Sequence, residues 1–141
     1  MTRPKKKSSR KNAQPQPAKA APPTVFVVDD EPMIGEVVEA ILQLEGYRTQ
    51  VFQDPEIALR TLSKSKEKPI VLLTDFVMPG MNGMELIERC KKARPDLKTI
   101  LFSGNFGEDI LRYYAVKPDR FLSKPFQPRA LTAVLNGIMT T

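Results

Sequence analysis

Hydrophobic residues from position 24 onward follow two patterns that alternate along the chain. Short runs rich in Val, Ile and Leu, such as TVFVV at 24–28 and IVLLT at 70–74, are typical of strands buried on both faces of a sheet. Between these runs, apolar residues recur at every third or fourth position, as on the buried face of a helix. Strands are predicted at 24–28, 48–52, 70–74, 99–102 and 120–122, and helices at 32–45, 55–62, 84–93, 108–114 and 128–138.

Residues that begin and end helices agree with this division. Pro32 and Pro128 suit the first turn of a helix, and Asp54 followed by Pro55 pairs an N-cap residue with a proline at the next position. Gly46 is typical of a helix end. Five strands alternating with helices predict an α/β fold, in which a parallel sheet carries helices on both faces.

Polar side chains follow the predicted strands at the point where each strand ends. Asp29 and Asp30 follow the first strand, Asp75 the third, Ser103 the fourth, and Lys124 lies just past the fifth. The carboxyl ends of parallel strands meet at one edge of the sheet, where such folds bind their ligands. The sequence therefore predicts three carboxylates, a hydroxyl and an ammonium group at one edge.

The three carboxylates indicate a metal site. Anions in a partly desolvated cleft repel one another and raise each other's pKa, and a bound divalent cation removes that difficulty. A small set of oxygen ligands completed by water suits Mg²⁺.

The same groups are those that phosphoryl transfer requires. Asp75 is placed as the nucleophile, and Lys124 can hold an oxygen of the phosphoryl group. The hydroxyl of Ser103 and the backbone N–H of Gly104 can hold another.

Each residue also has a simpler structural interpretation when it is taken alone. The pair Asp29 and Asp30 can cap a helix, Asp75 before a Pro-Gly loop can be turn chemistry, and Ser103 with Gly104 is a common loop pair. Their occurrence together, in order along the chain, favours a site.

Four motifs that carry these residues, VVDDEP, LLTDFVMPGMNG, ILFSG and FLSKPF, resemble the receiver domain of bacterial response regulators, including single-domain receivers of the chemotaxis type. The resemblance covers about residues 25–138. It implies a flavodoxin-like doubly wound sheet with strand order 2-1-3-4-5. It also implies that an aspartate takes up a phosphoryl group with the help of Mg²⁺.

The resemblance assigns a role to each matching residue. Asp75 matches the phosphorylated aspartate, Asp30 the direct metal ligand, Asp29 the acid that reaches the metal through water, Val77 the backbone carbonyl ligand, Ser103 and Phe121 the switch pair, Lys124 the phosphate-binding lysine, and Lys124–Pro125 the cis peptide. Two features depart from the common pattern. Ser103 replaces a more frequent threonine, and the segment 104–120 is short and lacks the usual Gly-Ala. Taken alone, Phe121 would be read as a core residue.

The first 23 residues differ from the rest in composition. They carry seven Lys and Arg, no acid, and five of the 13 prolines, so we predict a disordered tail at 1–23 and a receiver domain at 24–141. The remaining residues hold 15 Lys and Arg against 16 Asp and Glu, so the formal charge of +6 comes from the tail. The tail is interpreted as a solubilising segment, or as a contact for an acidic surface such as nucleic acid or anionic lipid.

Several classes of protein are excluded or disfavoured. There is no histidine, which excludes nucleophile pairs and metal sites built on histidine, and one cysteine forms no intrachain disulfide. No secretory signal or membrane-spanning run is found, so a cytoplasmic setting is expected. No DNA-binding or enzymatic domain is expected after the last helix.

The function expected is that of a stand-alone receiver. A sensor histidine kinase or a histidine phosphotransfer protein would donate to Asp75, and output would be contact with a downstream protein or onward relay of phosphate. Apart from self-catalysed transfer and dephosphorylation, no enzyme activity is expected.

Three other functions are alternatives to that of a receiver. A phosphorylation-independent binding module would keep the fold and bind partners constitutively. A haloacid-dehalogenase-like phosphatase is disfavoured because Asp75 is followed by Phe76 and Val77 rather than by a second aspartate two residues on. Nucleotide binding is disfavoured because no Walker glycine pattern occurs.

Overall fold

A computed structural model of the protein describes residues 22–66, 68–104 and 108–140. The predicted tail at 1–23 lies outside the described residues except for its last two positions. Its disorder and the domain boundary at residue 24 therefore stay predictions.

Every predicted element is present, with ends moved by one or a few residues. The strands are β1 (Thr24–Val28), β2 (Arg48–Phe52), β3 (Val71–Asp75), β4 (Lys98–Ser103) and β5 (Arg120–Ser123). The helices are α1 (Pro32–Leu44), α2 (Pro55–Lys64), α3 (Gly83–Ala93), the 3-10 helix η2 (Glu108–Tyr113) and α4 (Pro128–Met139).

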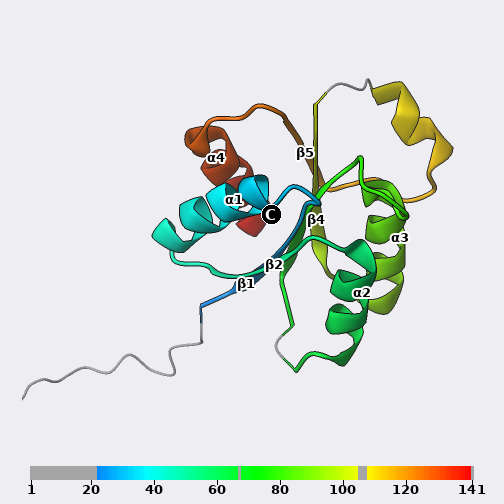
Figure 1. Ribbon diagram of the computed structural model, residues 1–141, viewed down its shortest axis with the longest axis horizontal. Coiled ribbons are helices and arrows are strands. Elements are labelled where there is room, and N and C mark those ends of the chain that lie inside the picture. Colours follow the sequence, from blue (N-terminus) through cyan, green and yellow to red (C-terminus); the bar gives the residue numbers. More distant parts are fainter. Residues whose placement is uncertain (1–21, 67, 105–107, 141) are drawn as a thin grey trace, which may run out of the picture.

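The sheet is parallel throughout, in the order β2-β1-β3-β4-β5, which confirms the predicted topology. Helices α1 and α4 cover one face of the sheet, and α2 and α3 cover the other (Figure 1). Because the strand order reverses between β1 and β3, the carboxyl ends of these two strands flank the crevice where such folds bind ligands.

The core consists of two layers, one on each side of the sheet. Alternate residues of a strand point to opposite faces, so Phe26 packs in the layer under α2 and α3 while Val25 and Val27 pack in the layer under α1 and α4. All five residues of β1 and of β3 are buried. Each fully buried aliphatic side chain contributes about 1.5–3 kcal/mol. These layers hold the two central strands, and thus the residues at their ends, in fixed positions.

The fourth helical segment is short, as predicted, and has 3-10 geometry. The prediction was a short helix at 108–114, and the structure has the 3-10 helix η2 there. Leu111 is buried and Tyr114 packs against the same layer. Their spacing of three residues matches the three residues per turn of a 3-10 helix.

The start of α3 lies directly against the end of β3. Asn82 caps the helix in a reciprocal box, in which its side chain accepts from Glu85 N–H and the Glu85 carboxylate accepts from Asn82 N–H, each at 2.9 Å. Gly83 follows, and its N–H donates to the carbonyl of Phe76 at 2.8 Å. A Cβ at Gly83 would overlap the carbonyl oxygen of Asp75 and stand 2.9 Å from Leu101 Cδ1. Only glycine lets the helix come this close to β3.

We therefore expect Gly83→Ala to destabilise the protein by about 1–3 kcal/mol, the usual cost of forcing an extra methyl group into a packed site. Gly137→Ala in α4 is the matched control, because a Cβ there meets nothing within 4 Å. That control should stabilise the helix by about 0.5–1 kcal/mol. Urea unfolding measures both, and equal stabilities for the two variants would contradict the predicted contact.

Candidate functional site

Three carboxylates meet at the carboxyl ends of β1 and β3. One oxygen from each of Asp29, Asp30 and Asp75 lies within 4.8 Å of the other two. Strands β1 and β3 are neighbours, with Val28 opposite Thr74, so the residues that follow are brought together by the register. The predicted convergence of the three acids is confirmed.

Asp29 is the most deeply buried of the three acids, with no exposed surface. Its N–H donates to the carbonyl of Phe52 at 3.0 Å, which continues the pairing with β2. Its carboxylate accepts from the N–H of Glu31 at 2.8 Å. Asp29 thus sits between strand and helix with its charge directed into the site, whereas Asp30 is partly exposed.

Lys124 neutralises part of this charge. Its Nζ lies 3.1 Å from Asp29 and 3.2 Å from Asp75, so one ammonium group contacts two carboxylates. The same Nζ stands 5.0 Å from the ring centroid of Phe102, within cation–π range. Burial by itself would lower the pKa of Lys124, but the hydrogen bond and charge of Asp29, joined by Asp75, raise it overall. Lys124 is therefore a permanent cation.

Asp75 experiences opposing influences. Burial first, and the charge of Asp29 second, raise the pKa of its carboxyl. Lys124 and the N–H of Phe76, which donates to Asp75 Oδ1 at 2.9 Å, lower it, but the net direction is upward. Folding thus makes the ionised carboxylate of Asp75 less favourable than it would be in water.

The donor set fits a hard divalent cation. Three carboxylate oxygens stand close enough to share one ion, and one lysine does not fully offset their charge. Asp29, Asp30 and Asp75 could hold the ion, with further positions left for water. When bound, such an ion supplies positive charge to the acids and to any phosphoryl oxygens nearby.

The other predicted residues lie around this cluster. Ser103 ends β4 and is buried, one residue beyond Phe102, which is paired with Asp75. The carbonyl of Ser103 accepts from the N–H of Lys124 at 2.8 Å, and Gly104 is exposed next to it.

Three remaining predictions concern Val77, Phe121 and Pro125. Val77 lies two residues after Asp75 and is 70% exposed. Phe121 is half-buried on β5 and packs against the core layer under α2 and α3. The Lys124–Pro125 peptide bond is cis.

One contact near the site was not foreseen from the sequence. The side chain of Asn82 donates to the hydroxyl of Tyr114 at 3.0 Å, which ties the loop after Asp75 to the segment after Ser103. The Asn-Gly pair before a helix signals a cap, but nothing in the sequence indicates its partner 32 residues away.

The raised pKa of Asp75 leads to a stability prediction. An acid whose pKa is higher in the folded state destabilises that state once the pH exceeds its unfolded pKa. In EDTA at pH 7, Asp75→Asn should therefore raise Tm, because the variant lacks the charge that burial and Asp29 disfavour, and the gain should vanish as the pH falls below about 4.

Asp54→Asn is the matched control for thermal unfolding. Asp54 accepts from Glu56 N–H as the N-cap of α2, and an asparagine amide oxygen can accept the same bond. A lower Tm for Asp75→Asn than for the parent protein at pH 7 would show that Lys124 outweighs the repulsion.

Comparison with known proteins agrees with this geometry. Residues 25–136 match the family model described as the response regulator receiver domain. The chain is 30% identical over 119 residues to the phosphate regulon transcriptional regulatory protein PhoB of Pseudomonas aeruginosa, covering 82% of this chain and 51% of that protein. It is 32% identical over 112 residues to the putative two-component response regulator ARR21 of Arabidopsis thaliana, and the match covers 78% of this chain and 18% of that protein.

Solved structures show the same fold. A CheY-like response regulator receiver domain protein from Methanospirillum hungatei has a TM-score of 0.77 at 27% identity, covering 84% of this chain and 94% of that one. The chemotaxis protein CheY4 of Vibrio cholerae has a TM-score of 0.76 at 26% identity, and the match covers 84% of this chain and 99% of that one. The chain spans about half the length of the bacterial regulator above, and much less of the plant one. In the described part of the chain, no helix is long and apolar enough to cross a membrane.

Proposed function

The chain belongs to the response regulator receiver domain family, and from this membership we propose that it accepts a phosphoryl group on Asp75 from a phosphohistidine donor. The observation that carries the proposal is the meeting of three carboxylates within 4.8 Å, two of them in contact with Lys124. This arrangement combines a nucleophile, a cation site and a fixed positive charge. The donor would be a sensor histidine kinase or a histidine phosphotransfer protein.

The two oxygens of Asp75 differ in their surroundings. Oδ1 accepts from the N–H of Phe76 and contacts Lys124. Oδ2 has no hydrogen-bond partner among the described residues, so it is free to attack. In the transfer, this oxygen would bond to phosphorus as the P–N bond of the donor breaks, and the imidazole nitrogen would take a proton from solvent. A water molecule would later attack phosphorus and return phosphate and the free carboxylate.

The other residues would stabilise the charge of the transferred group. Lys124 would move from the carboxylates to a phosphoryl oxygen, and Ser103 with the N–H of Gly104 would hold another. We propose Mg²⁺ as the ion, held by Asp29, Asp30, Asp75 and the carbonyl of Val77, because oxygen ligands and room for water suit it.

Phosphoramidate provides the test, because it contains the P–N bond of the donor without the donor protein. Incubation of the chain with phosphoramidate and Mg²⁺ should add one phosphoryl group, measured by intact mass. Asp75→Ala should add none, and EDTA should abolish the gain for the parent protein. Asp54→Asn, a change to another aspartate outside the site, should be labelled like the parent.

No gain for the parent under conditions that label another receiver would rule out phosphoacceptance. The protein would then be a phosphorylation-independent binding module. Labelling that persists in Asp75→Ala would place the acceptor on another residue.

We further propose that phosphorylation changes the surface formed by β5 and the segment before it. Ser103 and Phe121 lie on neighbouring strands, since β4 pairs with β5 through Leu101 opposite Phe121. A move of Ser103 toward the phosphoryl group would leave space for Phe121 to turn inward, and a downstream protein or relay partner would detect the change.

NMR spectra of the labelled chain test the switch. Phosphorylation should shift backbone signals of residues 111–121 as well as those at the site. In Ser103→Ala, the mass gain should persist at a lower rate while the distant shifts are lost. Spectra that change only at the site would contradict the switch and leave phosphoacceptance intact.

The remaining expectations also stay proposals. We assign residues 24–141 to the receiver and 1–23 to a separate basic tail, which either keeps the chain in solution or contacts an acidic surface, and we place the exchange in the cytoplasm. The absence of a DNA-binding domain is an expectation only, because regulators such as the one from Pseudomonas aeruginosa extend well beyond the matched region.

A further inference from the structure

A cavity lies at the amino-terminal edge of the sheet, at the opposite end from the acidic cluster. It has a volume of about 360 Å³, at the lower end of the range for small-molecule pockets. The cavity opens where β3 and β4 begin, beside Ile70 and Lys98, and the last turn of α4 forms one wall. None of its lining residues takes part in the site described above.

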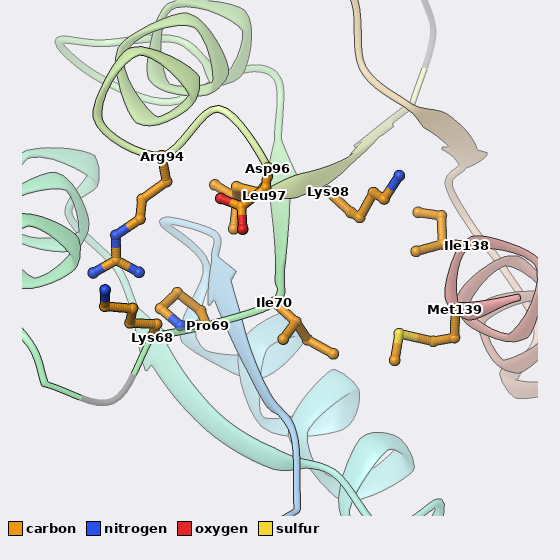
Figure 2. A pocket seen from close by; sticks show the side chains of 9 residues that line it. All are labelled: Lys68, Pro69, Ile70, Arg94, Asp96, Leu97, Lys98, Ile138 and Met139. Carbon is orange, nitrogen blue, oxygen red and sulfur yellow. The ribbon is translucent and has the colours of Figure 1, made fainter. Parts of the chain in front are cut away.

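The lining is divided into a cationic side and an apolar side. Figure 2 shows the ends of Lys68 and Arg94 on one side of the cavity and Ile138 and Met139 on the other, with Ile70 between them. Lys98 is a third cation, and its end lies beside Ile138, away from Lys68 and Arg94 (Figure 2). Asp96 is the only acid among the described residues of the lining, so these residues carry an excess of positive charge.

The cationic side is partly held in place. Arg94 Nη2 donates to the carbonyl of Leu62 at 3.0 Å, near the end of α2, which fixes the guanidinium group. Within the described part of the chain, the Arg94 side chain makes no other hydrogen bond, and Lys68 makes no side-chain bond or ion pair. The free donors of Arg94 suit the two oxygens of a carboxylate.

The apolar side is continuous with the core. Ile138 is buried in the layer under α1 and α4, whereas Met139 remains 42% exposed. An apolar group in the cavity would cover Met139 and Ile70, and the flexible methionine side chain adapts to different shapes.

We propose that this cavity binds a small organic carboxylate with an apolar body. The carboxylate would pair with Arg94 and Lys68, and the apolar body would lie against Ile70, Ile138 and Met139. Asp75 does not line this cavity, so the carboxylate would bind whether or not the chain accepts a phosphoryl group.

Titration of the ¹⁵N-labelled full chain with octanoate, below its micelle concentration, tests the proposal. Saturable NMR shifts should gather at residues 68–70, 94–98 and 138–139. Octanamide has the same apolar body without the charge, and acetate has the charge without the body. Each should bind at least about fivefold more weakly than octanoate, because each loses one of the two kinds of contact.

Two variants distinguish binding in the cavity from a general effect of the protein's positive charge. Lys68→Gln should weaken octanoate about two- to fivefold, the effect of losing one solvent-exposed ion pair. Arg129→Gln removes the same charge from the first turn of α4, about 15 Å along the helix from Met139, and should change nothing. Shifts scattered over other surfaces, equal binding of octanamide, or equal loss in both variants would overturn the proposal.

Discussion

Mutual repulsion between buried carboxylates is the constraint on which this end of the molecule depends. Asp29 has no exposed surface and Asp75 is 7% exposed, yet their side chains lie close enough to share one ion. Charges of like sign at that separation and burial are costly unless a cation stands between them. Lys124, which directly follows the edge strand β5, supplies that cation by contacting both acids at once.

The surrounding strands and helices fix the positions of the two acids. β1 and β3 are buried along their whole length, so the acids cannot withdraw into solvent without disrupting the core. The cap at Asn82 and the close approach of Gly83 bring α3 against the carbonyl of Asp75. Because protein interiors are densely packed, a movement of Asp75 would also displace atoms of α3 and of the neighbouring strand β4.

The two edges of the sheet carry opposite chemistry. Acids gather at the carboxyl ends of the strands, and cations with an apolar wall line the cavity at the amino ends. β3 joins the two, because it begins next to Ile70 and ends at Asp75. The connection from β4 to β5 is tied to the other side of the site. It contains the 3-10 helix η2, and the hydroxyl of Tyr114 accepts a hydrogen bond from Asn82.

The sequence by itself determined the order and type of the elements and the residues that end each strand. Periodicity, prolines, caps and glycines act within a few residues, so they predicted the parallel sheet and the acids at its edge. The short helix at 108–114 was predicted without a type, because spacing over six residues separates α from 3-10 geometry poorly. Tertiary structure alone decided that Lys124 contacts Asp29, 95 positions away, and that Tyr114 accepts from Asn82. It also decided that Lys68, Arg94 and Met139 line one cavity. Such contacts depend on strand register and on how helices pack over the sheet, and these arise from the whole chain rather than from any local pattern.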